Sequence, residues 1–274
     1  MPEQLLTTPR KPEEVSELKA LVQMYYDVQR FRLRGNNRVK ALSRGASKSE
    51  RLQLPVDSLQ SIEDGIAKNI LQVVKDEPIW PWLSAQRGIG HILAAAIIAS
   101  GLDPEIDKPS SWWRYAGVGI VDGKNQRPRR GEKRTYNGFL RRTLYVLVTS
   151  FLKSHDPSRD RSSFYAELYY RFREESIRNR PELSIAHPCK RCKQTGKLKD
   201  KISEVDKICD WCNGKGESET MFHHHARAMM LTQRVFLTHL QEKWRSALKL
   251  TRPRFPYIVE KEPGVHKYIE APGP

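Results

Sequence analysis

Apolar residues recur at alternating intervals of three and four along the first helix that the sequence predicts, over residues 15–42. This spacing is typical of a helix that packs along a partner helix. The series runs through Leu18, Leu21, Tyr25, Val28, Arg32, Gly35, Val39 and Leu42. Because Arg32 and Gly35 interrupt it, we expect a helical hairpin or a short self-association contact, not a long perfect coiled coil.

A polar connection is expected over 43–54, followed by a second amphipathic helix that Pro78 ends. The apolar face of this helix comprises Leu59, Ile62, Ile66, Ile70 and Val73. Residues 1–80 are therefore predicted to form a helical hairpin or coiled-coil region, of which residues 1–14 are a loose polar leader.

A glycine turn, Gly88-Ile89-Gly90, then precedes an apolar helix over 93–100. A helix-hairpin-helix begins its second helix in this way. Glycine adopts positive φ and lets the backbone approach another surface closely. The N–H groups at the following helix N-terminus can hold an anion. In a basic chain, we expect that anion to be a nucleic-acid phosphate.

Further helices are predicted across the rest of the chain, so the fold class is mainly α. Ser110 or Ser111 is expected to cap a helix that carries Trp112, Trp113 and Tyr115 and stops at Gly117. Other helices are expected over 139–152, 164–178 and 221–248. The predicted segments are a helix-hairpin-helix domain over 81–182, a cysteine-bearing insertion over 183–217, a helix completing the helical domain over 218–250, and a loose tail over 251–274.

The chain is strongly basic, with 48 Lys and Arg against 32 Asp and Glu in 274 residues and a formal charge of +16. Such an excess favours a polyanionic partner. A membrane is not expected, because no apolar run approaches the ~20 residues that span a bilayer. The N-terminus lacks the pattern of a secretory signal. We therefore expect a cytoplasmic, nucleoid-associated protein.

The basic charge is concentrated in a loop over 119–138 and in the helix that follows. The segment from Lys124 to Arg142 contains eight Lys and Arg and a single acidic residue, Glu132. Like charges in such a loop repel unless a polyanion neutralises them, although a solvated loop without a ligand is the alternative. The candidate nucleic-acid-binding residues are Arg87, Gly88, Gly90, His91, Lys124, Arg127, Arg129, Arg130, Lys133, Arg134, Arg141 and Arg142, with Arg141 and Arg142 facing outward. Tyr115, Tyr136, Trp112 and Trp113 are candidates for base stacking, although we expect Trp112 or Trp113 to serve the core.

All four cysteines lie in two C-x2-C knuckles, Cys189/Cys192 and Cys209/Cys212, separated by sixteen residues. This spacing predicts a closed Cys₄ site for structural Zn²⁺. The alternative is a pair of reduced or disulfide-forming motifs. The knuckles also resemble the cysteine-rich repeats of J-domain chaperones, but the His-Pro-Asp tripeptide of the J domain is absent.

Three consecutive histidines, His223-His224-His225, lie in a predicted helix. Successive side chains on a helix point ~100° apart, which disfavours a shared metal, so we expect a helix surface or a polar face near nucleic acid.

Several motifs in their order resemble a known family. They are Leu18-Lys19-Ala20-Leu21-Val22, Asn36-Asn37-Arg38-Val39-Lys40-Ala41-Leu42, Gly88-Ile89-Gly90, Tyr115-Ala116-Gly117-Val118-Gly119 and Asn137-Gly138-Phe139-Leu140-Arg141-Arg142-Thr143-Leu144-Tyr145. The set is similar to the C-terminal half of the insertion-sequence-110 transposases, which include the pilin-gene invertases. The resemblance covers about residues 12–182 and 220–245.

The resemblance implies DNA strand exchange, guided in some family members by a structured RNA. That family joins a RuvC-like nuclease domain with acidic metal ligands to a helical domain that supplies a serine. Here the nuclease domain is not matched, and no Ser or Thr lies between Ser111 and Thr135, where the serine is expected. Thr135 is the remaining candidate for the hydroxyl nucleophile that the chemistry needs.

We therefore expect a DNA-binding protein related to transposases and site-specific recombinases, which binds duplex or branched DNA and self-associates through its N-terminal helices. One alternative is an active recombinase subunit that works with a separate nuclease, for which Mg²⁺ would be required. Another is an RNA-binding scaffold subunit, because basic helices with a zinc knuckle serve structured RNA equally well.

Overall fold

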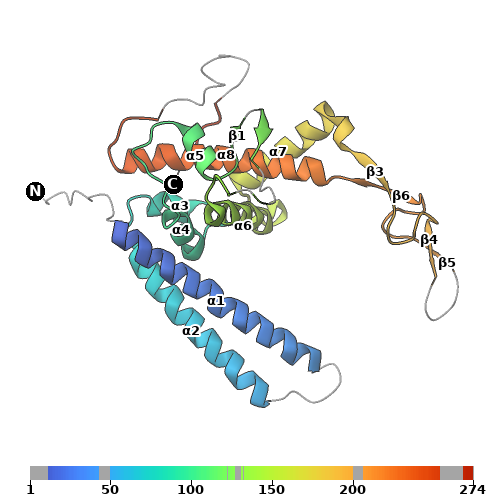
Figure 1. The fold of residues 1–274 in the computed structure, drawn as a ribbon, viewed down its shortest axis with the longest axis horizontal. Coiled ribbons are helices and arrows are strands. Elements are labelled where there is room, and N and C mark those ends of the chain that lie inside the picture. Colours follow the sequence, from blue (N-terminus) through green and yellow to red (C-terminus); the bar gives the residue numbers. More distant parts are fainter. Residues whose placement is uncertain are drawn as a thin grey trace, which may run out of the picture. The chain divides into compact units, whose positions relative to one another are not determined.

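The computed structural model describes residues 12–42, 50–121, 123–126, 131, 133–199, 206–253 and 268–273 (Figure 1). It is mainly helical, as predicted. The chain forms two compact units, one of Met1–Phe164 with Gln233–Pro274 and one of Tyr165–Thr232. The predicted division instead grouped the helix over 164–178 with the helices before it.

The first unit contains α1 (Pro12–Leu42), α2 (Glu50–Lys75), α3 (Trp80–Ala85), α4 (His91–Ile98), α5 (Pro109–Tyr115), β1 (Ile120–Val121), β2 (Lys124–Asn125), α6 (Gly138–Ser154) and a 3-10 turn (Pro157–Arg159). The second contains α7 (Phe164–Asn179), a 3-10 turn (Pro181–Leu183), β3 (Ile185–Pro188), β4 (Lys197–Lys199), β5 (Asp206–Ile208) and β6 (Glu217–Thr220). The last helix, α8 (Phe222–Ala247), begins in the second unit and ends in the first.

The predicted helical hairpin is confirmed: α1 and α2 lie side by side (Figure 1). Both residues that interrupt the α1 apolar series contact α2. Arg32 Nε donates to Glu63 Oε2 at 2.6 Å, and a Cβ at Gly35 would lie only 2.8 Å from Val56 Cγ2. The interruptions are therefore a polar pair across the hairpin and a close helix approach.

The predicted connection over 43–54 is too long, because α2 begins at Glu50 and includes Pro55. Packing of Val56 against Gly35 gives these early turns a partner on α1. Within α2, Ile62 was assigned to the apolar face but is 52% exposed, whereas Glu63 is buried. The ion pair with Arg32 compensates the burial of that carboxylate.

The glycine-turn helix α4 forms the centre of the first unit. Its residues 94–98 are buried, and α4 packs against α1, α2, α3 and α6. Consecutive alanines in α4 let these neighbours approach closely. Phe236 of α8 adds aromatic packing, with its ring 5.9 Å from those of both Trp82 and Phe151.

Trp112 is a core residue, in agreement with the prediction that either Trp112 or Trp113 would be. It is buried, and its ring packs edge-on against that of Trp244, with the ring centroids 6.2 Å apart. The helix that carries it, α5, is not capped by a serine. Lys108 is the N-cap and Pro109 the first helical residue, so Ser110 and Ser111 lie inside the helix. Proline suits that first position because its missing N–H has no intrahelical acceptor there.

The C-terminal segment is not the loose tail predicted over 251–274, because residues 268–273 dock on the first unit. Trp82 Nε1 donates to the Pro272 carbonyl at 3.0 Å, and Gln86 Nε2 donates to that of Gly273 at 3.2 Å. His239 Nε2 lies 2.7 Å from the Ile269 carbonyl. Proline-rich composition suggested a free tail, but these carbonyls satisfy buried polar side chains. Residues 254–267 lie outside the described residues.

No helix among the described residues combines the length and the apolar character that crossing a membrane requires.

Candidate metal centre and basic surfaces

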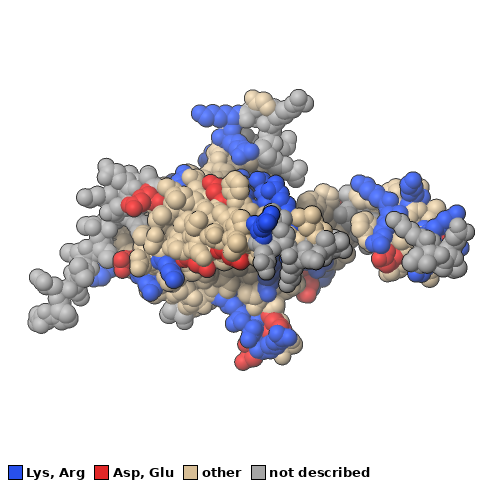
Figure 2. All heavy atoms as spheres, turned by 90° about the horizontal axis from the view of Figure 1, so that it is seen from below, with Lys and Arg blue, Asp and Glu red and all other residues tan. Residues whose placement is uncertain are grey.

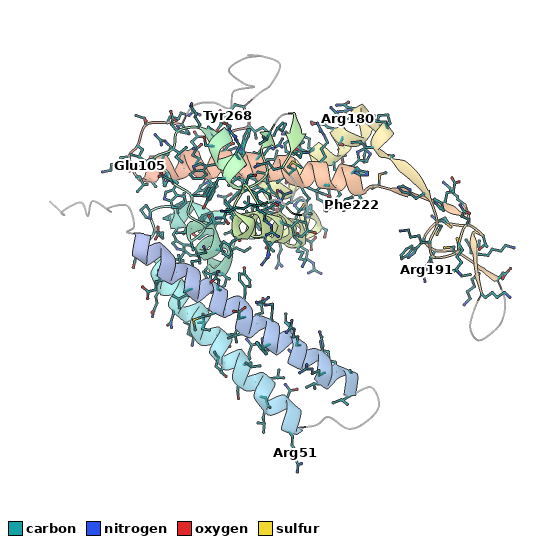
Figure 3. The ribbon with its side chains drawn as sticks, in the orientation of Figure 1. Arg51, Glu105, Arg180, Arg191, Phe222 and Tyr268 are labelled. Carbon is teal, nitrogen blue, oxygen red and sulfur yellow. The ribbon has the colours of Figure 1, made fainter. Side chains whose placement is uncertain are left out.

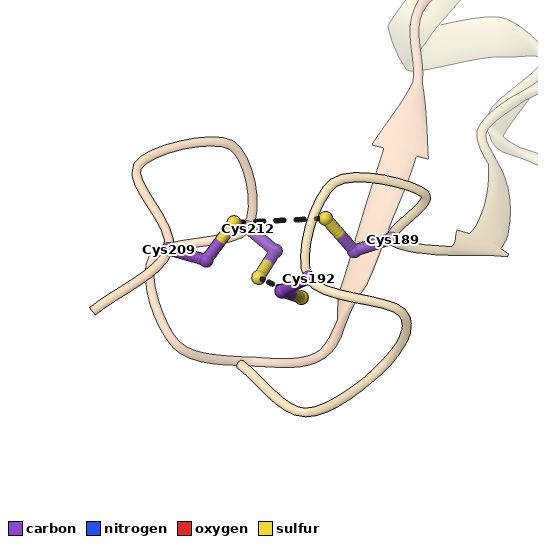
Figure 4. Close-up of side chains that lie close together, drawn as sticks. All are labelled: Cys189, Cys192, Cys209 and Cys212. Atoms are coloured by element: carbon purple, nitrogen blue, oxygen red, sulfur yellow. Dashed lines mark hydrogen bonds between the residues drawn. The ribbon is translucent and has the colours of Figure 1, made fainter. Parts of the chain in front are cut away.

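Four buried cysteines converge in the second unit, with all their sulfurs within 4.8 Å of one another (Figure 4). Cys189 Sγ lies 3.8 Å from Cys209 Sγ, and Cys192 Sγ lies 3.6 Å from Cys212 Sγ. A disulfide requires about 2.05 Å, so neither pair is bonded. Four thiolates gathered in this way can hold a metal ion.

The two knuckles have the same backbone conformation. After the second cysteine of each, positive φ occurs at the first, second and fourth following positions: Lys193, Gln194 and Gly196 in one knuckle and Asn213, Gly214 and Gly216 in the other. The knuckles also exchange backbone hydrogen bonds. The Cys189 N–H donates to the Gly216 carbonyl at 2.9 Å, and the Cys209 N–H donates to the Gly196 carbonyl at 2.8 Å.

Glycine is required at the fourth position of each turn. A Cβ at Gly196 would collide with the Gly214 carbonyl oxygen, and one at Gly216 would collide with the Gln194 carbonyl oxygen. Each knuckle thus passes close to the backbone of the other. The sequence therefore fixes the approach of the two halves as well as their ligands.

The strands continue this approximate two-fold relation. Antiparallel β3 and β6 pair from Ile185↔Thr220 to Pro188↔Glu217, and β4 pairs with β5. The chain enters through β3 and leaves through β6, so the entry and exit points of the insertion are paired residues. We call residues 185–220 the knuckle module.

Backbone N–H groups prepare the Cys189 sulfur for metal binding. The N–H groups of Cys192 and Arg191 lower the pKa of the Cys189 thiol to about 7. Burial raises the pKa of Cys192 to about 11, despite the Gly196 N–H that donates to its sulfur at 3.3 Å. A bound cation would favour the thiolate of Cys192 at neutral pH, which its raised pKa otherwise disfavours.

Among the described residues, the groups of three or more possible metal ligands that lie close together comprise only the four cysteines, and the three consecutive histidines are not part of such a group. The predicted helix surface is wrong for His224, which is fully buried between Ser176 Oγ (2.9 Å from Nδ1) and Ser184 Oγ (3.0 Å from Nε2). His225 Nδ1 lies 2.6 Å from the Tyr169 hydroxyl, and burial lowers the pKa of His225. Of the three histidines, only His223 is exposed.

The glycine turn between α3 and α4 is present, but its two glycines differ. Gly88 has φ +99°, and a Cβ there would lie 2.8 Å from Ser154 Oγ and 3.1 Å from Phe151 Cδ1. Its close approach is therefore to α6. Gly90 has φ −89°, which any residue adopts, and it is exposed with open space around a notional Cβ. The positive φ and close approach expected of the glycine turn therefore occur at Gly88 and not at Gly90.

The groups at this turn that are suited to binding an anion are backbone N–H groups and the Arg87 side chain. The first intrahelical bond of α4 joins the Ala94 N–H to the Gly90 carbonyl, so the three preceding N–H groups lack an intrahelical acceptor. Arg87 is exposed, and its Nε donates to the Ser154 carbonyl at 2.9 Å. His91 is half-buried, and burial lowers its pKa.

The outer face of α6 continues from this turn, because Ser150 Oγ donates to the Gly88 carbonyl at 2.7 Å. The sequence of α6 contains no Asp or Glu. Its exposed stripe consists of Arg142, Tyr145, Val146 and Lys153, with half-buried Thr149 between them. We call these five residues the α6 face. The outward position predicted for Arg142 is confirmed.

Arg141 faces inward, contrary to the prediction. Its Nη1 donates to the carbonyls of Gly117 (2.8 Å) and Gln126 (2.9 Å), and its guanidinium lies 4.9 Å from the Tyr136 ring centroid. The Tyr136 ring in turn covers Gly117, where a Cβ would lie 2.5 Å from Cδ2. Both side chains therefore anchor the basic loop to α5 and α6.

Part of the basic loop is folded, because β1 and β2 form a hairpin in it. Lys133 and Arg134 are exposed. Arg127, Arg129 and Arg130 lie outside the described residues, as does the side chain of Lys124. Asn137, which the sequence placed in a family-like motif but not as a helix cap, ends the loop as N-cap of α6. Its Oδ1 accepts from the N–H groups of Phe139 and Leu140.

Thr135 is exposed, and its hydroxyl accepts from Gln126 Nε2 at 3.5 Å. An amide cannot take up the hydroxyl proton as a general base would.

Two further candidates for base stacking, Trp113 and Tyr115, form hydrogen bonds within the protein. Trp113 Nε1 donates to the Arg234 carbonyl at 3.1 Å, and the Tyr115 hydroxyl donates to that of Ser100 at 2.9 Å.

No protein-family model matches the chain, and no curated protein matches it significantly.

Proposed function

We propose that the cysteine cluster binds one structural Zn²⁺. Four sulfurs about 2.3 Å from a central zinc lie about 3.8 Å apart in a tetrahedron. The two cross-knuckle separations of 3.8 and 3.6 Å fit that value. With four protein ligands the coordination is complete, so zinc stabilises the fold and leaves no position for a substrate.

We further propose that the chain is a DNA-binding protein that contacts the phosphate backbone through the α3–α4 turn, the α6 face and the basic loop. The α6 face carries this proposal. Arg142 and Lys153 lie at its ends, about 16 Å apart along the helix, with exposed Tyr145 between them and no acidic residue in α6. A formal charge of +16 supports a polyanionic partner.

The α3–α4 turn extends this surface. Arg87 and Lys153 meet at the same end of α6, where Arg87 donates to Ser154. The N–H groups of residues 91–93 at the start of α4 have no intrahelical acceptor and are suited to a phosphate oxygen. Contacts of these kinds give affinity that is independent of sequence and weakened by salt. In a cell, such a protein would be associated with the nucleoid in the cytoplasm.

Salt titration of DNA binding tests the proposal. Fluorescence anisotropy with a labelled duplex of about 20 base pairs and with a four-way junction measures affinity between about 50 and 200 mM NaCl. We expect affinity to fall at least about tenfold over this range as counterions compete for the phosphates. Absence of binding, or affinity that does not change with salt, contradicts it. If unlabelled structured RNA of equal length displaces the DNA at far lower concentration, the RNA-binding alternative replaces it.

A further inference from the structure

Of the six tryptophans in the chain, all of them described, Trp211 is the one that is mostly exposed, at 63%. It lies inside the second knuckle, between ligands Cys209 and Cys212. Tryptophan on a surface is costly in water and is enriched where proteins meet a ligand. Trp211 is not part of the buried cluster that the four cysteines form with Leu198.

An arginine from the other knuckle packs over the Trp211 indole ring. Arg191 and Trp211 occupy equivalent positions in the two C-x2-C motifs, and the Arg191 guanidinium lies 5.6 Å from the Trp211 ring centroid. Arg191 Nη1 also pairs with Asp210 Oδ2 at 3.1 Å, which fixes the guanidinium beside the ring. One face of the indole is thus held by a cation, and the exposed fraction shows that much of the ring remains accessible (Figure 3 labels Arg191).

The knuckle that carries Arg191 is basic. The segment over 189–199 contains five Lys and Arg and no Asp or Glu. Arg191 and Lys197 have ion-pair partners, whereas Lys190, Lys193 and Lys199 are exposed and have none among the described residues. Figure 2 shows Lys and Arg side chains on several sides of the knuckle module. A flat exposed ring, with ammonium groups on the knuckle that carries Arg191, suits a nucleotide's base and phosphates.

We propose that the Trp211–Arg191 pair is a binding site for unpaired nucleotides, in which a base stacks on the open face of Trp211 and Lys190 and Lys193 contact the adjoining phosphates. Base–aromatic stacking is insensitive to sequence, because every base has a π-face. A base inside a duplex is already stacked and cannot reach the indole. The site therefore favours single-stranded or branched nucleic acid over duplex, and this inference deepens the proposed DNA-binding function.

Intrinsic fluorescence and anisotropy of the full-length, zinc-loaded protein test this site with an oligothymidylate of about 12 nucleotides and a duplex of equal length. We expect the oligothymidylate to quench tryptophan emission, and Trp211→Ala to remove the quenching and weaken single-strand binding about 5- to 100-fold. Duplex affinity should change little. Phe222→Ala removes a similarly exposed aromatic outside the knuckle module and should leave both affinities unchanged. Zinc content of one ion per chain verifies that each variant is folded at the cysteine site.

Unchanged single-strand affinity in zinc-loaded Trp211→Ala overturns the inference. So does an equal loss for duplex and single strand. If Trp211→Ala retains oligothymidylate binding but loses binding of a reduced, unfolded polypeptide, the ring is a peptide site. Failure of duplex binding in the parent protein, with Trp211-dependent quenching by oligothymidylate retained, contradicts only the duplex part of the proposed function.

Discussion

At the scale of single residues, Glu63 shows how a buried charge holds the α1–α2 hairpin. It accepts hydrogen bonds from Arg32 Nε at 2.6 Å and Gln29 Nε2 at 3.0 Å. Burial raises the pKa of Glu63, but the hydrogen bonds from Arg32, Gln29 and Tyr25 outweigh it, and the net pKa lies below the ordinary value of 4.5. The folded state therefore favours the ionised form.

We expect Glu63→Gln to lower the free energy of unfolding at pH 7 by about 3 kcal/mol, because Arg32 then keeps a charge without its partner. A lowered folded pKa gives stability that is present above the unfolded pKa and lost as the pH falls through the folded pKa. The difference between variant and parent should thus shrink below about pH 4.5. Urea unfolding at about pH 7 and about pH 4 measures it, with exposed Asp64→Asn as the control. A difference that is equal at both pH values would show that Glu63 acts without its charge.

Gly88 and Gly90 provide a matched pair at the α3–α4 turn. Gly88→Ala places a Cβ against Ser154 and Phe151 at φ +99°, whereas Gly90→Ala enters open space at φ −89°. We expect Gly88→Ala to reduce stability by about 2 kcal/mol through backbone strain and steric conflict, and Gly90→Ala to change it little. Thermal unfolding of both variants measures this, and equal midpoints would rule out the packing of Gly88 on α6.

Sequence periodicity predicts which residues of a helix face a partner only when burial follows hydrophobicity. It identified the hairpin, but it assigned Ile62 to the interface in place of Glu63. The reason is that a buried carboxylate depends on Arg32, which lies 31 residues away in the chain. Similarly, Arg141 and Arg142 are the same residue type with the same charge, so the sequence does not distinguish them. Arg141 is the anchoring residue because the Gly117 and Gln126 carbonyls lie within its reach, whereas Arg142 is exposed.

At the scale of elements, we expect the knuckle module to depend on the proposed zinc ion more than the helices do. The hydrophobic cluster among its described residues consists of the four cysteines, with Leu198 partly buried against them. Such a small cluster buries too little apolar surface to fold alone, so we expect the proposed zinc ion to supply the stabilisation. The C-x2-C spacing sufficed to predict this site, because ligand type and local turns determine it.

We expect a chelator, or Cys209→Ser, to unfold the knuckle module and leave most of the helical signal intact, because the helices of the first unit have their own core. Hydrogen exchange should show loss of protection at the Cys189 and Cys209 amides, which bond across the knuckles. Adding Zn²⁺ should restore protection after chelation but not in Cys209→Ser. Amides that stay protected in the metal-free protein would contradict a structural role for the ion.

The C-terminal segment could not be predicted, because its docking uses backbone carbonyls that carry no sequence signal. Pro272 and Gly273 accept from Trp82 and Gln86, which lie 190 and 187 positions earlier in the chain. Composition alone favoured a free tail.

At the scale of the whole molecule, we propose that nucleic acid binds electrostatically at distinct surfaces. The first unit offers the α3–α4 turn, the α6 face and the basic loop, and the second offers the Trp211–Arg191 pair. Self-association through α1 and α2 stays a prediction, and exposed Met24, Phe31 and Leu42 on α1 are the residues that would mediate it. Loss of one surface should weaken binding without abolishing it.

The salt dependence of duplex binding by the double variant Arg142→Ala/Lys153→Ala tests the central claim most directly. Each lost phosphate contact reduces the slope of log affinity against log salt by about 0.9. We predict a slope smaller by about 2 than that of the parent, and no change for Lys68→Ala, which removes an exposed cation from α2. An unchanged slope in the double variant, with DNA still bound, would contradict the assignment of the α6 face as the phosphate-binding surface.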